Sequence, residues 1–481
     1  MNISEKVGEG ILATTLKGHQ GSVLCLDVSS PCRRDDTNQL KSSNTTSLTA
    51  TCSFLLLSGS EDHTARLWDL REHRKRACLC VQTFGDVLSA MFAPNCGVDL
   101  SNEHVVSPFG LDCTIYLAVE NSVLEYDLRH TKAPIVREAT RNLGTVLQHQ
   151  DEVNQISLAY GCIHHPQQQK QQQQQSKKHF KKGRKGSKLT NNTATIDDSS
   201  LYLAACDDAG TVRFMDIKNT TTSSILHHDP KGVAVVPTCA FRPRSQSKGI
   251  MRIAAGLEVV SGGSDCKINL WDLSRPKKPI SYFTIENVSS INSDGHTSKP
   301  QVCNPPLVHS LAWSASGQSL AAGLGNGSIG IFTVDNRRLV QTGLIDEDSH
   351  NASVVSVVYS DFSQDSAERI LCSAGSDGTI LFWDVGSREW SDEGWEQDET
   401  NDSQQAMGEK ADIAGIFAES LSMKEERPRK GFGKTRKLFD IPHGRKLNWV
   451  TKATSPSNNK RDTIFVADTS TEITCYSIPM R

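Results

Sequence analysis

The sequence predicts an all-β fold made of repeated pairs of strands. Residues 57–69 read as a strand, a tight turn and a second strand whose side chains alternate between polar and apolar. The same arrangement returns at residues 260–272 and 371–384. In all three segments a serine lies ten positions before a tryptophan, and an aspartate lies six positions before it. Such identical internal spacing indicates a structural repeat.

Four weaker copies of the pattern fill the gaps between these segments. Each keeps the two apolar strands and the turn but replaces the tryptophan with another large side chain, which is Tyr126, Met215, Phe332 or Tyr476. These copies cover residues 115–127, 203–216, 320–332 and 463–476. Together with the three strong copies they make seven repeats along the chain.

These residues resemble WD repeats, in which each copy forms one blade of a β-propeller. The resemblance covers nearly the whole chain, and it implies a single seven-bladed propeller over residues 1–481. Residues 11–16 form a strand with no partner in their own copy, while the last copy stops after its third strand. We therefore expect the N-terminal strand to complete the last blade, which closes the ring and removes two open sheet edges.

A histidine before the first inner strand completes a polar set in the first repeat. We expect His19 to bond Asp62, with the relay continuing through Ser58 to the indole N–H of Trp68, because buried donors require acceptors. The corresponding residues of the other two strong repeats are Ser261, Asp265 and Trp271, and His350, Ser373, Asp377 and Trp383. Such sets have the composition of a Ser-His-Asp triad, but their expected role is to lock the sheet, and no catalytic residue is predicted.

Composition excludes several classes of function. A net charge of −3 and a pI near 6.6 argue against a global field for nucleic acid or membranes. The fourteen cysteines include no C-x-x-C pair, which favours buried or idle thiols in a reducing compartment. Neither a metal-ligand cluster nor a phosphate-binding glycine loop is evident, so we expect no metal, no cofactor and no small-molecule substrate. No apolar run is long enough to span a bilayer, and the expected location is the nucleus, the cytoplasm or both.

Three polar stretches interrupt the repeats. Residues 29–53 are expected to form a surface loop, and residues 163–199, with a glutamine tract and a lysine-rich run, to be disordered. The lysine-rich run fits a nuclear-import signal or a tolerated insertion better than a nucleic-acid contact, because aromatic residues are hardly interleaved with it. Residues 386–440 form a charged flexible insert before the last blade. Within it, residues 413–421 have helical apolar spacing, which fits a short helix or a solvated linker.

Two repeats end in an aromatic residue followed by Asp, Leu and Arg. These are Trp68, Asp69 and Arg71 in the first repeat, and Tyr126, Asp127 and Arg129 in the second. The pattern resembles the docking box of substrate receptors that bind the damaged-DNA-binding adaptor of cullin–RING ubiquitin ligases. The second box departs from that pattern, with Glu120 where an aspartate is expected. A pair of guanidinium groups could engage a partner bidentately, or could instead pair with the local carboxylates.

The sequence therefore predicts a non-enzymatic protein-interaction scaffold. The resemblance implies a candidate substrate receptor of a cullin–RING ubiquitin ligase that docks through Arg71 and Arg129. The alternative is a general peptide- or protein-binding scaffold in a nuclear or chromatin complex.

Overall fold

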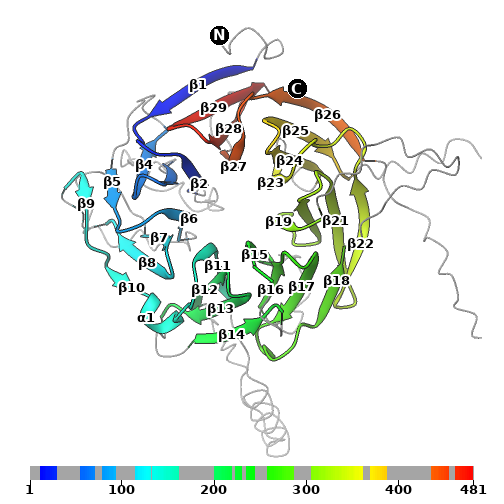
Figure 1. Ribbon diagram of the computed structural model, residues 1–481, viewed down its shortest axis with the longest axis horizontal. Coiled ribbons are helices and arrows are strands. Elements are labelled where there is room, and N and C mark those ends of the chain that lie inside the picture. The colour runs from blue at the N-terminus through cyan, green and yellow to red at the C-terminus, as the bar shows by residue number, and fades with distance from the viewer. Residues whose placement is uncertain are drawn as a thin grey trace, which may run out of the picture.

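Seven sheets, antiparallel except for one parallel strand pair at the rim, surround a central axis in the computed structural model (Figure 1). The structure describes residues 11–29, 55–70, 79–93, 114–129, 131, 133–161, 200–218, 223–229, 234–243, 257–285, 305–360, 369–386, 435–453 and 461–479. Each sheet is one blade, with its first strand near the axis and its last at the rim. The prediction of a seven-bladed β-propeller is confirmed.

The blades follow one another in chain order. Blade 1 contains β2 (Val23–Val28), β3 (Leu55–Ser60), β4 (Thr64–Asp69) and β5 (Leu79–Gln82). Blade 2 contains β6 (Val87–Phe92), β7 (Thr114–Val119), β8 (Ser122–Asp127) and β10 (Arg141–Asn142). Blade 3 contains β11 (Val153–Gly161), β12 (Ser200–Asp207), β13 (Thr211–Asp216) and β14 (Ser223–His227). Blade 4 contains β15 (Thr238–Phe241), β16 (Glu258–Gly262), β17 (Lys267–Asp272) and β18 (Ser281–Thr284).

The remaining blades complete the ring. Blade 5 contains β19 (Val308–Trp313), β20 (Ser319–Leu324), β21 (Ile329–Asp335) and β22 (Arg338–Ile345). Blade 6 contains β23 (Val354–Ser360), β24 (Ile370–Gly375), β25 (Thr379–Asp384) and β26 (Arg436–Pro442). Blade 7 contains β27 (Leu447–Ala453), β28 (Arg461–Asp468), β29 (Glu472–Pro479) and, as its outermost strand, β1 (Leu12–Lys17).

The N-terminal strand closes the ring as the sequence predicts. β1 runs antiparallel to β29, in a register that pairs Leu12 with Ser477 and Lys17 with Glu472. The two strands lie side by side at the rim, so the first and last parts of the fold share one blade (Figure 1). β29 therefore has a partner on each side, and its backbone N–H and C=O groups are not left at a sheet edge.

An outer strap, residues 133–147, ties three blades together at the rim. Its strand β9 (Ile135–Val136) pairs in parallel with β5 and adds a fifth strand to blade 1, and β10 then returns to blade 2. The Arg141 side chain pairs with Glu125 and also donates to the carbonyl of Ile217 in blade 3. The strap ends in α1 (Gly144–Leu147), the one helix within the described residues. Across all the residues that the structure describes, no helix has the length and apolar character needed to cross a membrane.

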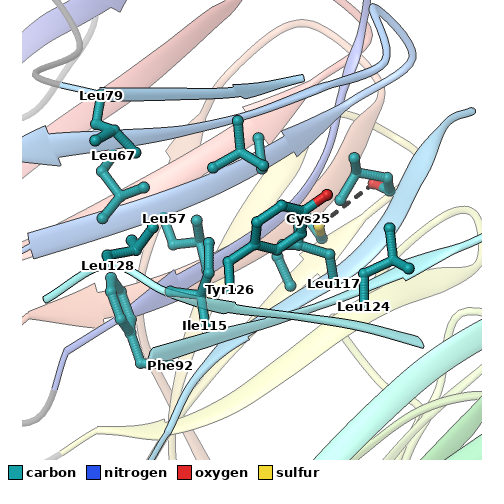
Figure 2. Close-up of a cluster of buried hydrophobic side chains, with 14 of the residues drawn as sticks. Cys25, Leu57, Leu67, Leu79, Phe92, Ile115, Leu117, Leu124, Tyr126 and Leu128 are labelled. Carbon is teal, nitrogen blue, oxygen red and sulfur yellow. Dashed lines mark hydrogen bonds between the residues drawn. The ribbon is translucent and has the colours of Figure 1, made fainter. Parts of the chain in front are cut away.

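The apolar core is divided into seven clusters, one between each pair of neighbouring blades. The large side chain that marks each repeat lies in the third strand of its blade and packs against the preceding blade. Accordingly, one such residue occurs in each cluster: Trp68, Tyr126, Met215, Trp271, Phe332, Trp383 and Tyr476. Figure 2 shows the cluster between blades 1 and 2, where Tyr126 lies among leucine and isoleucine side chains of both sheets. The repeat pattern of the sequence is thus a pattern of blade-to-blade packing.

Hydrogen bonds between inner strands fix the blades relative to one another. The hydroxyls of Ser89, Ser310 and Ser356 each accept the backbone N–H of a residue in the next blade, at donor–acceptor distances of 3.1–3.3 Å. Between blades 1 and 2 this acceptor is a carboxylate, because Asp27 Oδ2 accepts the N–H of Phe92 at 2.8 Å. Burial raises the pKa of Asp27 to about 7, against the opposing effect of the backbone N–H bonds.

The polar inserts lie mostly outside the described residues. This holds for residues 30–53, for residues 163–199, and for the possible helix at residues 413–421. The end of the third insert is different, since residues 436–440, expected to be flexible, form most of strand β26. The reason is apolar packing, because the Phe439 ring stacks on Phe382 at 4.3 Å between centroids and Ile441 is fully buried.

Candidate protein-docking site

The predicted polar set of blade 1 is assembled in the structure. Trp68 Nε1 donates to Ser58 Oγ at 2.9 Å, and Ser58 Oγ lies 2.8 Å from His19 Nε2. The other ring nitrogen, His19 Nδ1, lies 3.0 Å from Asp62 Oδ2. With His19 Nδ1 protonated, every donor in this series of hydrogen bonds has an acceptor. Asp62 also accepts the backbone N–H of Gln20, so the set joins the entry to β2 with the turn after β3.

Blade 6 repeats this geometry. Trp383 Nε1 donates to Ser373 Oγ at 3.0 Å, Ser373 Oγ lies 2.8 Å from His350 Nε2, and His350 Nδ1 lies 3.2 Å from Asp377 Oδ1. Burial alone would raise the pKa of Asp377, but the bonds from His350 and Thr379 outweigh it and lower that pKa. Ser58 and Ser373 are both fully buried, so their hydroxyls cannot reach a substrate. In both blades the set links the segment before the inner strand to the second and third strands of the sheet.

Blade 4 uses a histidine that the sequence reasoning missed. Ser261 Oγ accepts from Trp271 Nε1 at 2.9 Å, and it lies 2.7 Å from His228 Nδ1, while His228 Nε2 lies 3.1 Å from Asp265 Oδ1. The imidazole is reversed relative to blades 1 and 6. Burial would raise the pKa of Asp265, but the bonds from His228 and Lys267 lower it to about 2. His228 follows the last strand of blade 3, ten residues before β15, so spacing gave no signal for it.

Two further blades carry partial sets. In blade 7, His443 lies between the Tyr476 hydroxyl at 2.8 Å and Asp468 Oδ2 at 2.6 Å, so a tyrosine takes the place of the serine and tryptophan. In blade 3, His149 Nδ1 lies 2.8 Å from Asp207 Oδ2. Both histidines lie four residues before an inner strand, as His19 and His350 do. That spacing is the signal that could have revealed them.

The blade 3 set is incomplete, because His149 Nε2 is buried without a hydrogen-bond partner. Ala205 of blade 3 occupies the position that Ser58 has in blade 1. The two residues have the same register relative to the inner strand and the third strand of their blades. We expect Ala205→Ser to supply the missing partner and to raise the free energy of unfolding by about 1 kcal/mol. Urea denaturation followed by circular dichroism measures this change.

The neighbouring Ala204→Ser is the matched control. Ala204 is equally buried but lies in the cluster between blades 3 and 4, on the opposite side of the sheet from Ala205. A hydroxyl there enters an apolar cluster, so this variant should lose stability. Equal losses in the two variants would contradict the proposed contact with His149.

The two candidate docking boxes lie at the ends of β4 and β8, the third strands of neighbouring blades. The aromatic residues of the boxes, Trp68 and Tyr126, are buried at 0 % and 2 % exposure, so they support the site from inside. Leu128 is also fully buried and packs into the cluster between blades 1 and 2 (Figure 2). These anchors hold the residues on either side of Leu128 at the surface. Asp69 is half-buried, and Arg71 lies outside the described residues.

Arg129 forms a bidentate ion pair with the aspartate of its own box. Its Nε and Nη2 atoms donate to the two carboxylate oxygens of Asp127 at 2.9 and 2.6 Å, and half of the Arg129 side chain remains exposed. The structure therefore has the local pairing that was one of the two alternatives for this residue. The planar guanidinium is held in one orientation at the surface.

The corresponding aspartates of blades 4 and 6 are also paired with arginines. Asp272 accepts from Arg337 of blade 5 at 2.5 Å, and Asp384 accepts from Arg369 at 2.7 Å. Both arginine side chains are about half exposed, like that of Arg129. An arginine beside the last aspartate of the third strand is thus a recurrent feature, supplied from different places in the sequence. Among the described residues, no group of three or more His, Cys, Asp and Glu side chains is arranged to hold a metal ion.

The seven blades define a β-propeller, and the hydrogen-bonded sets of His, Ser, Asp and Trp in blades 1, 4 and 6 are similar to those of WD repeats. Residues 10–69 and 343–384 match the family model described as "WD domain, G-beta repeat". The chain is similar over nearly its whole length to the WD repeat-containing protein 53 homolog of Dictyostelium discoideum, with 23% identity over 97% of this chain and 95% of that protein. It is also similar to WD repeat-containing protein VIP3 of Arabidopsis thaliana, with 26% identity over 34% of this chain and 43% of that protein.

Proposed function

We propose that this propeller is a non-enzymatic scaffold that acts as a substrate receptor of a cullin–RING ubiquitin ligase. The proposed contact is made by Arg71 and Arg129, at the ends of β4 and β8, with the damaged-DNA-binding adaptor. The observation that carries the proposal is the surface placement of Arg129, whose flanking residue Leu128 is buried in the core and whose guanidinium is fixed by Asp127. A preoriented cation loses little conformational freedom when a partner binds.

The local ion pair is compatible with docking. Half of the Arg129 side chain is exposed, so acidic or carbonyl groups of a partner can approach the guanidinium while Asp127 holds it. An exposed pair of this kind contributes little to stability, which makes Arg129 a residue that can be changed without unfolding the blade. Its effect on binding can therefore be measured separately.

The test is capture of the full-length protein by the purified adaptor. We expect wild type to bind and Arg71→Ala with Arg129→Ala to bind at least about tenfold more weakly, as for central arginines of interfaces. The matched control is Arg337→Ala with Arg369→Ala, which removes the arginines paired with Asp272 and Asp384. This control should bind as wild type does.

Two results would reject parts of the proposal. If wild type fails to bind the adaptor, the ligase function is rejected. If wild type and the double variant bind equally, the two arginines are rejected as the docking site. A general loss of binding in both double variants would indicate an electrostatic effect of the face as a whole and would also reject the specific boxes.

The lysine-rich run within residues 163–199 supports a second, separate proposal on localisation. We propose that it directs part of the protein to the nucleus, because clustered lysines are the composition that import receptors recognise. Microscopy of a fluorescent fusion that lacks residues 167–188 tests this, and an unchanged distribution would reject it.

A further inference from the structure

The joint between blades 3 and 4 holds two thiols that donate to the same backbone carbonyl group. Cys206 lies in β12 of blade 3 and Cys239 in β15 of blade 4, and both side chains are buried and reduced. Their sulfur atoms lie 3.5 and 3.9 Å from the same acceptor, the backbone carbonyl oxygen of Gln155. Both side chains belong to the buried cluster between blades 3 and 4. One thiol from each blade thus meets the other at a single carbonyl group on the boundary of the two blades.

The position of Cys206 is one where neighbouring blades approach closely. Cys206 directly follows Ala205 in the second strand of blade 3. The residues at the same place in blades 1, 4 and 5 are Gly59, Gly262 and Gly323. A Cβ atom added at Gly59 or Gly262 would lie 2.4–2.5 Å from a valine methyl group of the next blade. At the joint between blades 3 and 4, Cys206 stands where these blades have glycine, and the inner strand of blade 4 begins with Thr238 where blades 1, 2, 3, 5 and 6 begin theirs with valine. The Cys206 side chain therefore lies at the contact between the two blades.

We propose that Cys206 and Cys239 are a disulfide-forming pair that covalently links blade 3 to blade 4 under oxidising conditions. With hydrogen peroxide, one thiolate attacks the O–O bond, forming a sulfenic acid and releasing hydroxide. The second thiol then displaces water from the sulfenic sulfur as the S–S bond forms. Two thiols lose two electrons and two protons, and one peroxide is reduced to two water molecules.

The environment makes this reaction conditional on opening of the joint. Burial raises the pKa of Cys206 well above that of a free thiol, and the neighbouring Cys239 thiol adds to this rise. In the closed ring the thiolate is therefore scarce and oxidant has no access. Bonds across this joint, such as Phe241 N–H to Ser157 Oγ at 3.1 Å, must part before peroxide can reach the sulfur. Once formed, the disulfide would keep the joint closed.

The test is peroxide treatment of the full-length protein, followed by alkylation and mass spectrometry of a non-reducing digest. We expect a peptide pair joined through Cys206 and Cys239, two hydrogens lighter than the separate peptides and released by dithiothreitol. The oxidised protein should unfold at a temperature about 5 °C higher than the reduced protein. Slow oxidation that accelerates in urea below the unfolding transition is expected, because urea favours open states.

Variants make the test specific. Cys206→Ser or Cys239→Ser should remove the linked peptide, and Cys25→Ser should keep it, because Cys25 is buried at the joint between blades 1 and 2. The proposal is overturned if both thiols of wild type are recovered in alkylated form after peroxide treatment in urea. It is equally overturned if either cysteine is found linked to a different one. Both results come from wild type, so they do not depend on whether a variant folds.

Discussion

Replacing Trp68 with alanine is expected to lower the free energy of unfolding by about 3–5 kcal/mol. The indole is fully buried between blades 7 and 1, and its removal leaves a cavity that the two sheets cannot fill without moving apart. The change also deletes the indole N–H that donates to Ser58 Oγ, so the polar set loses the hydrogen bond at its tryptophan end. Urea denaturation followed by far-UV circular dichroism measures the loss.

Trp68→Phe separates the two contributions. Phenylalanine keeps most of the apolar volume but cannot donate to Ser58, so we expect a loss of about 1–2 kcal/mol. Tyr282→Ala is the matched control, because this aromatic residue is 65% exposed on the outermost strand of blade 4, and its removal should cost about 0.5 kcal/mol or less. A loss in Trp68→Ala no larger than that in Tyr282→Ala would contradict the role of Trp68 in packing blade 1 against blade 7.

Deleting residues 1–17 is expected to open the ring. The deletion removes β1, so β29 becomes an exposed edge strand and loses the backbone bonds of a six-residue ladder. We expect the thermal midpoint to fall by about 10 °C or more, and a larger share of the protein to aggregate through the new edge. The ion pair between Lys17 and Glu472 contributes little to this effect, because 65% of the lysine side chain is exposed.

The matched control for this deletion is removal of residues 1–10 alone, which leaves β1 intact. Differential scanning calorimetry and size-exclusion chromatography compare the two truncated proteins with the full chain. If both truncations unfold at the same temperature as the full chain, ring closure by β1 contributes nothing to stability, and the expectation is wrong.

The sequence was informative wherever a repeat has a fixed spacing. Serine, aspartate and tryptophan at constant intervals identified the three strong blades, and the lone strand at residues 11–16 indicated how the ring closes. His19 and His350 could be placed because each lies four residues before its inner strand. His228 could not, because a connection of unusual length separates it from blade 4, and only the folded chain shows which serine it reaches.

Other features depend on contacts that leave little trace in one sequence. The outer strap pairs only two residues of β9 with β5, and two residues carry too little periodicity to predict a strand. Residues 436–440 read as the basic end of a charged insert, although packing of Phe439 on Phe382 places them in a sheet. The pairing of Arg337 with Asp272 joins residues from different blades, so adjacency in the sequence could not suggest it.

The meeting of β1 and β29 in one blade means that the circle has no intrinsic starting point. The chain could be joined between its present ends and cut at another connection, and every blade would keep the same neighbours and the same seven interfaces. The order of the repeats around the circle, rather than the place where synthesis begins, is what specifies this architecture.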